Sequence, residues 1–476
     1  MIASTPAAGS GMPPERGEVT PAHSAAGAGG WRGARRTVLL AGGAGAVLAA
    51  ACGTGQTTPV PATGERKPVT ITYMSLGDAA SDRVAQERAL FDNYQREAAG
   101  ATINLEATGS ANWGALKEKF IIRATGGDAA DLVMNNWGTW SDMSEGGMLT
   151  ELTPLLKRDK IGFDLYLPSA IESHTADGKL WGMPVSMSVD AIAYNLDLLE
   201  SAGLKPPPVD PTDKTWTMDR FLEYAQKLTR PGEQYGFGGA YSGFATVGVA
   251  DGTFFGRLAW DDKQRKCLMD SAEFRTGLQY WNDLPLRYHV QPDAQEQTAL
   301  RGGLAGNIFL TGKIGMQGTL SPFPKSQTPF RWALATLPYS GSGPNVSSRM
   351  WATALHVGRT PRTDAAWEFL RWTTKPENGG QFPYTAGHAV SPLVKGGSDI
   401  AQKRMQQDAG IDPKAFLLQA QTSPVSGGGL LKYASWGKAV EELTPRYADF
   451  RANKLGTTDY ARAATEVFDR LMGARK

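Results

Sequence analysis

The chain has 476 residues, of which 41% are apolar and 20% are charged, and its formal charge is +2. This length is too great for one compact core, so we expect two domains. Four basic and two acidic residues precede Cys52, which leaves 45 basic and 45 acidic residues after it. Such an even balance of charge argues against a nucleic-acid-binding protein.

The amino-terminal region has the composition of an export signal. Residues 1–30 are rich in Ala, Gly, Pro and Ser, which predicts no fold there. The adjacent Arg35 and Arg36 then precede an apolar, glycine-rich run from Thr37 to Ala51. This run is shorter than the ~20 residues that span a bilayer. We therefore expect residues 1–51 to be a disordered extension plus a cleaved twin-arginine signal peptide.

The two cysteines have different surroundings. Small residues precede Cys52, which resembles a lipobox with Cys52 as the lipid-modified first mature residue. Residues 52–67 are polar and typical of a tether. Cys267 is expected to be a small packing residue rather than a catalytic thiol, and two cysteines do not make a disulfide framework.

Strand and helix patterns alternate at the start of the mature chain. Val69–Ser75, Ile103–Ala107 and Leu132–Met134 are typical strands, and apolar residues recur at helical spacing between them. This βαβαβ order predicts a mainly parallel sheet with helices on both faces, which binds ligands beyond the carboxyl ends of its strands. The apolar helix positions are Val84, Phe91 and Tyr94, then Trp113, Leu116 and Phe120.

Residues 177–229 carry a dense set of turn and cap signals. An apolar run broken by Pro184 leads to a strand at Ala191–Tyr194. Asn195 can cap a short helix over Leu196–Ala202 that Gly203 ends. After three prolines, Thr217 caps a second helix with one apolar face. That face consists of Met218, Phe221, Leu222, Ala225 and Leu228.

The order of these signals resembles the extracellular solute-binding proteins of sugar ABC importers, the maltose-binding-like family. That family carries a GK, G, P, YN, GL, TW and aromatic series in this order. In that family the segment carries the chain from the first lobe into the second, which implies that it lines the hinge and the cleft. The matching positions are Gly178-Lys179, Gly182, Pro184, Tyr194-Asn195, Gly203-Leu204, Thr215-Trp216 and Phe221.

Further segments between Val69 and Phe382 resemble the same family. Gly127–Val133 is similar to its G-D-x-P-D-hydrophobic run, with Ala130 in place of the proline, and Gly147–Leu155 to its G-x-L-x-x-L-x-P run. The remaining matches are Gly312–Met316 for a strand entry, and Ala333–Pro338 and Ala365–Leu370 for the return to the first lobe. The carboxyl-terminal part is predicted to be helical, with Tyr460, Ala464, Val467 and Leu471 on one face.

The resemblance implies an α/β, two-lobe periplasmic-binding-protein-like fold of type II, with discontinuous lobes joined by a hinge. We expect lobe one to comprise residues 68–188 and 340–388. Lobe two then comprises residues 189–339 and 389–476. Three crossings between the lobes follow from these boundaries.

No motif for metal or cofactor chemistry is present. The five histidines are far apart, and HExxH, CxxC, EF-hand, phosphate-loop and G-x-S-x-G patterns are missing. We therefore predict no cofactor, no metal and no catalytic residue. A carboxylate pair for glycoside hydrolysis stays open, because such pairs are distant in sequence.

Candidate ligand contacts follow the ends of the predicted strands. Amides, carboxylates and guanidinium groups suit sugar hydroxyls, and aromatic rings suit the apolar face of a pyranose. Trp113 and the other aromatic candidates have core packing as the alternative, and Asp78 and Asp190 have local capping. The predicted substrate-binding residues are Asp78, Asn112, Trp113, Asn135, Asn136, Trp137, Asp190, Tyr241, Gln317, Trp351 and Trp436. Weaker candidates are Ser110, Trp140, Phe244, Phe323 and Arg349.

The function implied by the resemblance is capture of a mono- or oligosaccharide in an inter-lobe cleft and its delivery to ABC permease subunits. The protein is expected to be a monomer, exported and held at the outer face of the cell membrane by a lipid anchor. Two alternatives remain. One is an exported glycoside hydrolase on another α/β scaffold, and the other is the same fold with a polyamine, phosphoester or metal complex as its ligand.

Overall fold

The computed structural model describes residues 69–98, 101–110, 112–136, 139–239, 259–261, 266–304, 307–339, 350–382, 390–393, 396–422 and 436–473. The chain divides into two units, Met1–Glu65 and Arg66–Lys476, and every described residue belongs to the second. The predicted export signal at Arg35 and Arg36 and the predicted lipidation site Cys52 lie outside the described residues.

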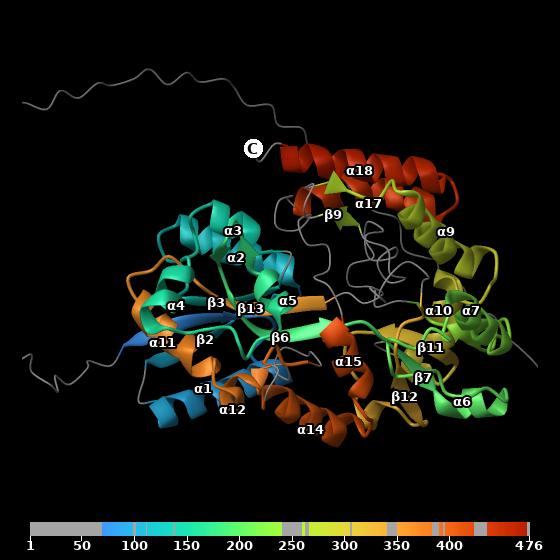
Figure 1. The fold of residues 1–476 in the computed structure, drawn as a ribbon, viewed down its shortest axis with the longest axis horizontal. Coiled ribbons are helices and arrows are strands. Elements are labelled where there is room, and N and C mark those ends of the chain that lie inside the picture. The colour runs from blue at the N-terminus through green and yellow to red at the C-terminus, as the bar shows by residue number, and fades with distance from the viewer. Residues whose placement is uncertain are drawn as a thin grey trace, which may run out of the picture. The chain divides into compact units, whose positions relative to one another are not determined.

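The first of two larger sheets has the strand order β2-β1-β3-β13-β6 (Figure 1). β1 (Thr70–Ser75) is parallel to both β2 (Thr102–Ala107) and β3 (Leu132–Asn136). β13 (Met350–Val357) inserts antiparallel between β3 and β6 (Met183–Val189). The predicted parallel opening is confirmed, and the late strand β13 makes this sheet discontinuous in sequence.

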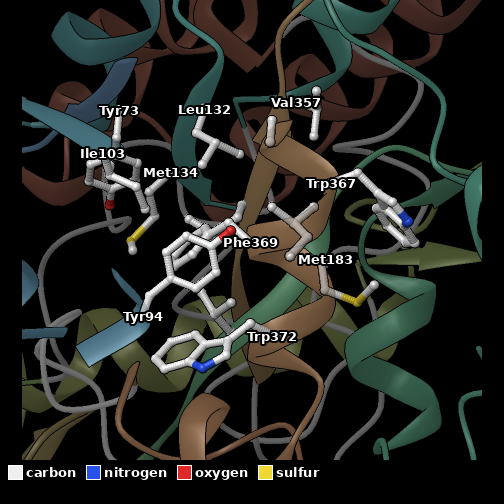
Figure 2. Close-up of a cluster of buried hydrophobic side chains, with 14 of the residues drawn as sticks. Tyr73, Tyr94, Ile103, Leu132, Met134, Met183, Val357, Trp367, Phe369 and Trp372 are labelled. Carbon is white, nitrogen blue, oxygen red and sulfur yellow. The ribbon is translucent and has the colours of Figure 1, made fainter. Parts of the chain in front are cut away.

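Aromatic and aliphatic side chains pack together in the core against this sheet, as Figure 2 shows. α1 (Asp82–Ala98) contributes Tyr94, whose ring packs edge-on against Phe369 and Trp372 of α11 (Thr363–Thr373), at centroid distances of 5.0 and 5.5 Å. α2 (Trp113–Thr125) buries Leu116 and Phe120. The predicted apolar faces of α1 and α2 are therefore confirmed.

The second sheet has the strand order β12-β7-β11-β8. Its strands are β7 (Ala191–Asn195), β8 (Tyr235–Phe237), β11 (Ile314–Thr319) and β12 (Trp332–Ala335). β7 is antiparallel to both β11 and β12, whereas β8 is parallel to β11.

The two capped helices after β7 form as predicted. The Asn195 side chain accepts a hydrogen bond from the Leu198 amide at the start of α6 (Leu196–Ser201). The Thr217 hydroxyl does the same for α7 (Met218–Lys227). α7 lies directly on the second sheet, because a Cβ at Gly236 would come within 1.9 Å of a backbone oxygen of that helix. Only glycine permits this contact.

The chain passes from the first sheet to the second through a single residue. β6 ends at Val189, β7 begins at Ala191, and Asp190 between them is fully buried. Pro184 does not interrupt β6, contrary to our expectation. The ladder with β13 instead shifts register there, since proline has no N–H to donate.

One hydrophobic cluster includes residues of both sheets. Met187 of β6, Ala193 of β7 and Ala352 of β13 belong to it, together with Phe416 of α15 (Lys414–Thr422). α15 therefore packs beside the crossing between β6 and β7. The exact lobe boundaries given above stay a prediction.

Shorter elements and the carboxyl-terminal helices complete the described chain. α18 (Thr457–Gly473) buries Tyr460, Ala464, Val467 and Leu471, which confirms the predicted apolar face. The shorter elements and the carboxyl-terminal helices are α3 (Ser141–Glu145), α4 (Thr153–Asp159), α5 (Pro168–Glu172), β4 (Thr175–Ala176), β5 (Lys179–Leu180), β9 (Trp260–Asp261), β10 (Lys266–Cys267), α9 (Ala272–Leu286), α10 (Ala294–Arg301), α12 (Pro376–Gly379), α14 (Gly397–Ala409), α17 (Trp436–Arg451) and α18 (Thr457–Gly473).

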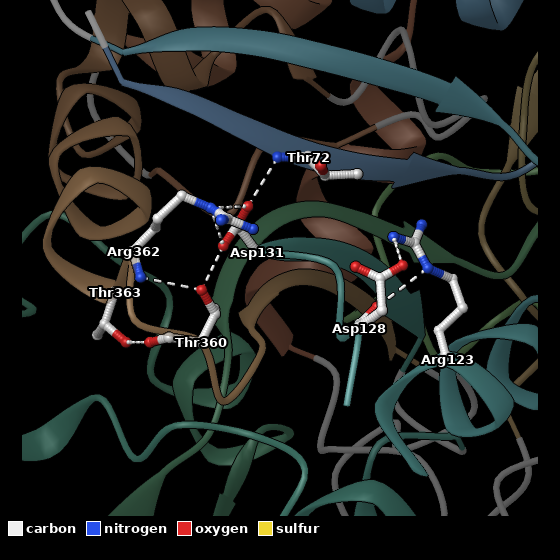
Figure 3. Close-up of polar contacts among 7 residues, drawn as sticks. All are labelled: Thr72, Arg123, Asp128, Asp131, Thr360, Arg362 and Thr363. Carbon is white, nitrogen blue, oxygen red and sulfur yellow. Dashed lines mark hydrogen bonds and ion pairs between the residues drawn. The ribbon is translucent and has the colours of Figure 1, made fainter. Parts of the chain in front are cut away.

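A buried carboxylate ties the late return of the chain to the first sheet (Figure 3). Asp131, just before β3, accepts hydrogen bonds from the Thr72 amide at 2.8 Å and from the Thr360 hydroxyl. Its Oδ2 also lies 2.9 Å from Nε of Arg362. Thr72 belongs to β1, whereas Thr360 and Arg362 follow β13. Asp131 is fully buried, so these contacts satisfy an otherwise costly charge.

Candidate functional site

The carboxyl ends of β1 and β2 meet in a tight backbone crossing. The Gly77 amide donates to the Ser110 carbonyl at 3.2 Å, and the Gly109 amide donates to the Gly77 carbonyl at 2.7 Å. Both glycines have positive φ, +102° and +62°, which side chains disfavour. The crossing brings the starts of α1 and α2 to one edge of the sheet, where α/β folds bind ligands.

Two predicted contacts at this edge are exposed side chains that accept hydrogen bonds from nearby backbone amides. The Asp78 carboxylate accepts from the Ala80 amide at 3.0 Å, and the Asn112 side chain caps α2 by accepting from the Ala115 amide at 3.0 Å. Each oxygen used in this way has further acceptor capacity. Capping and ligand contact are therefore compatible at both positions.

Trp113 lies half-buried at the first position of α2. The Arg83 guanidinium, from the first turn of α1, lies 5.1 Å from the centre of its ring. Trp113 also packs against two clusters of buried side chains that include residues of β1 and β3. A cation over an indole face is attracted by the ring quadrupole, so Arg83 holds the ring in place. Arg83 was not among the predicted site residues. Its (i, i+4) spacing to Glu87 was the available signal.

Asn135 and Asn136 lie inside β3 and not after it. They pair with Ala354 and Thr353 of β13, and both residues are buried. The Thr139 hydroxyl lies 2.7 Å from Oδ1 of Asn135 and 2.9 Å from Oδ1 of Asn136. Their amide oxygens therefore shape the turn after β3. We expected the strand to end at Met134, and the ladder with β13 extends it.

In the second sheet, Gln317 supports the end of β8. Its Nε2 donates to the carbonyls of Gly239, at 2.7 Å, and Gly318, at 3.1 Å. Its Oε1 is buried without a hydrogen-bond partner among the described residues. Gln317 thus fixes the turn that leads toward the predicted contact Tyr241, which lies outside the described residues, as does Phe244.

The remaining predicted residues fall into two groups. Trp351 pairs with Ser188 in the ladder between β13 and β6, and Trp436 begins α17, but the side chains of both lie outside the description. Trp137 and Arg349 lie outside the described residues altogether. The structure therefore places Asp78, Asn112 and Trp113 at one edge of the first sheet. It does not describe the side chains of the other aromatic candidates, Trp137, Tyr241, Trp351 and Trp436.

Two weaker aromatic candidates belong to the core. Trp140 is fully buried, and its indole N–H donates to the Ser173 carbonyl at 3.3 Å. Phe323 stacks on Phe309 at 5.0 Å and packs against Trp332. Both side chains contribute to packing rather than to a ligand platform. Ser110, by contrast, is buried at the crossing of β1 and β2, where its hydroxyl accepts from Thr108.

The described residues include neither a metal-binding cluster nor an exposed thiol. No group of three or more His, Cys, Asp or Glu in those ranges could hold a metal ion. Burial raises the pKa of the Cys267 thiol to about 12, so it stays protonated, as expected for a packing residue. None of the helices in the described part of the chain is long and apolar enough to cross a membrane.

Solved structures share this architecture. An ABC substrate-binding protein of Listeria monocytogenes in complex with cycloalternan matches with a TM-score of 0.68 and 19% identity, over 85% of this chain and 99% of that one. UgpB of Mycobacterium tuberculosis in complex with glycerophosphocholine matches with a TM-score of 0.67 and 15% identity, over 85% and 98%. The fold is thus the two-lobe, type II fold of solute-binding proteins.

Sequence comparison gives the family. A putative binding protein of Brucella abortus is 22% identical over 346 residues, covering 65% of this chain and 74% of that protein. The lactose-binding protein of Rhizobium radiobacter is 23% identical over 218 residues, covering 44% and 49%. The chain belongs to the bacterial extracellular solute-binding proteins, whose family model matches residues 78–380.

Proposed function

We propose that this protein captures a carbohydrate, a mono- or oligosaccharide, and delivers it to the permease subunits of an ABC importer. The observation that carries the proposal is the edge after β1 and β2, where exposed Asp78 and Asn112 lie with the indole of Trp113. Carboxylate, amide and indole together suit the hydroxyls and the apolar face of a sugar. The cycloalternan-bound and lactose-binding relatives support the same ligand class.

Capture would involve hinge closure. A ligand that bridges two lobes stabilises the closed population by its differential affinity for that state. Closure would bend the chain near the crossing between β6 and β7, at Asp190, and at two later crossings. The ligand would then meet residues of both lobes, with Trp113 and Trp351 proposed as contacts from lobe one and Tyr241 and Trp436 from lobe two.

The test is a binding assay on residues 53–476. We expect thermal unfolding to shift upward with at least one sugar among lactose, maltose, cycloalternan and tagatose, because a ligand at 100 times its Kd stabilises by about 2.7 kcal/mol. Chromatography should recover that sugar unchanged. A shift with glycerophosphocholine alone would replace the carbohydrate ligand by a phosphoester. Release of reducing ends, abolished by one Asp or Glu substitution, would establish the hydrolase alternative.

Trp137 is proposed as an aromatic platform. It follows β3 directly, at the carboxyl end of a buried strand. Trp137→Ala should weaken sugar binding by about 1–3 kcal/mol, or roughly ten- to a hundred-fold, from lost apolar contact. The control is Phe221→Ala on α7, a fully buried side chain whose loss should reduce the free energy of unfolding by about 3–5 kcal/mol. Normal binding by a Trp137→Ala protein as unstable as this control would make Trp137 a core residue.

The location is proposed to be the outer face of the cell membrane, through a lipid on Cys52. Cys52→Ser should release the protein into the soluble fraction, whereas Cys267→Ser should not, because Cys267 is buried. Arg35→Lys with Arg36→Lys should leave uncleaved precursor in the cell, since the arginine pair is the export address. Persistence of the Cys52→Ser protein on membranes after a carbonate wash would contradict the anchor.

A further inference from the structure

A buried ion pair lies beneath Trp113. Glu87 of α1 is fully buried, and its Oε1 lies 3.2 Å from Nε of Arg83, one helical turn earlier. The Tyr73 hydroxyl donates to Oε1 at 3.1 Å, and the Ser75 hydroxyl donates to Oε2. Three donors from α1 and β1 thus surround one carboxylate, which is the arrangement that stabilises a buried charge.

Arg83 has capacity left after these contacts. Nε faces Glu87, and Nη2 lies 3.0 Å from Sδ of Met134 on β3. Nη1 has no hydrogen-bond partner among the residues that the structure describes. The Arg83 side chain is 17% exposed, whereas Glu87 is inaccessible. A ligand at this edge can therefore reach the guanidinium but not the carboxylate.

Arg83 lies at the edge of the sheet where a ligand would bind. It is in the first turn of α1, beyond the carboxyl end of β1, and it covers the ring of Trp113, which begins α2 beyond the end of β2. Both helices start at the edge where sheets of this kind bind ligands. Guanidinium N–H groups donate well to hydroxyl oxygens.

Burial raises the pKa of Glu87, whereas Arg83 and the hydroxyls of Ser75 and Tyr73 oppose this shift. When Glu87 is ionised, its charge and that of Arg83 sum to zero. An anionic ligand group near Nη1 would be attracted by Arg83 and repelled by Glu87, which lies on the Nε side of the same guanidinium, so Glu87 offsets part of the attraction. A hydroxyl group is uncharged, so Glu87 does not repel it, and it can still accept a hydrogen bond from Nη1. The desolvation of an anion would remain uncompensated.

We propose that Arg83 contacts the ligand and selects uncharged, hydroxyl-rich sugars over anionic ones, and that Glu87 is the positioning residue that cancels the charge of Arg83. The inference rests on the proposed carbohydrate function and adds the charge class of the ligand. Glu87 acts only through Arg83, because it is closed to solvent. The pair is distinct from the exposed side chains of Asp78 and Asn112, which are proposed to bind hydroxyl groups.

The experiment compares affinities for matched neutral and anionic probes. The probes are lactose, maltose and tagatose, each beside its 6-phosphate ester, titrated calorimetrically into residues 53–476. Wild type should bind a neutral sugar at least about tenfold more tightly than its ester. Glu87→Gln keeps the shape of the side chain and the acceptor that faces Arg83 and Tyr73, and its NH2 group can donate to the Ser75 hydroxyl in place of the lost acceptor. The variant leaves the charge of Arg83 uncompensated, so this ratio should fall by about tenfold or invert.

Two further variants separate recognition from folding. Arg83→Gln removes the partly exposed donor and should weaken binding of the neutral sugar by about tenfold. Arg88→Gln, an exposed arginine on the same helix, should change neither affinity nor ratio. A purely structural role of Glu87 would lower stability and both affinities together and leave their ratio unchanged. Denaturant unfolding of each variant verifies that it is folded. If Glu87→Gln is unfolded, the affinity of Arg83→Gln for the neutral sugar provides the test.

The outcomes are separable. A ratio unchanged in Glu87→Gln, an affinity unchanged in Arg83→Gln, or a wild type that prefers the ester would overturn the charge selection while sugar binding stands. A wild type that binds none of the six probes, but responds to glycerophosphocholine, would overturn the carbohydrate function and this inference with it.

Discussion

Replacement of Asp131 by alanine should reduce the free energy of unfolding by about 3–4 kcal/mol, since hydrogen bonds to a buried charged acceptor contribute roughly 1.5–3 kcal/mol each. The Thr72 amide and the Thr360 hydroxyl lose their acceptor in this variant. The ion pair with Arg362 adds little, because that side chain is 41% exposed and solvent screens it. The network joins β1 to the segment after β13, so its loss weakens the attachment of that segment to the first sheet.

A matched control lies three residues earlier in the same run. Asp128 pairs with Arg123 at 2.7 Å, but its side chain is 77% exposed (Figure 3). Asp128→Ala should therefore change the free energy of unfolding by at most about 0.5 kcal/mol. Urea unfolding followed by far-UV circular dichroism measures both variants. Equal losses in the two variants would contradict the role assigned to the Asp131 network.

The sequence predicted the local elements of the fold because their signals are local. The cap at Asn195, the cap at Thr217 and the apolar face of α18 depend on residues within one or two turns. The end of β3 could not be predicted in the same way. Asn135 and Asn136 are poor strand formers, and they stay in the strand because β13, more than 200 residues later, pairs with them.

The location of the candidate site could be predicted from the sequence, but the tertiary contacts of its residues could not. Strand ends gave Asp78, Asn112 and Trp113, which the structure places at one edge. Trp140 had the same local signal, but it is fully buried, and its indole N–H donates to the Ser173 carbonyl just after α5. Arg83 was missed because its (i, i+4) spacing to Glu87 does not by itself indicate a site, and its contacts with Trp113 and Met134 are tertiary.

His356 should make the protein sensitive to acid. It is fully buried on β13, its Nδ1 lies 2.9 Å from the Trp181 carbonyl, and its Nε2 has no hydrogen-bond partner among the described residues. The rings of Trp140 and His174 lie 6.3 and 5.3 Å away. Burial disfavours the charged imidazolium and lowers the pKa of His356 from 6.5 to about 3 in the fold.

The sign of the effect follows from this shift. Between pH 6.5 and pH 3 the unfolded chain binds a proton at His356 and the folded chain does not, so stability falls as the pH falls through this window. The stabilisation is fully present above pH 6.5. Between pH 7 and pH 5, His356 alone should reduce the free energy of unfolding by about 2 kcal/mol.

Comparison with a His356→Asn variant isolates this contribution from the other titrating groups. An asparagine amide can still donate to the Trp181 carbonyl, but it takes up no proton in this range. Its free energy of unfolding should therefore fall by about 2 kcal/mol less than that of the wild type between pH 7 and pH 5. His289→Asn is the matched control, because His289 is exposed and its φ of +50° suits asparagine. Urea titrations at pH 7, 6 and 5 give the dependence of the free energy of unfolding on pH for the wild type and for each of the two variants. If the wild type and His356→Asn lose stability in parallel, the buried imidazole is not the source of the acid sensitivity.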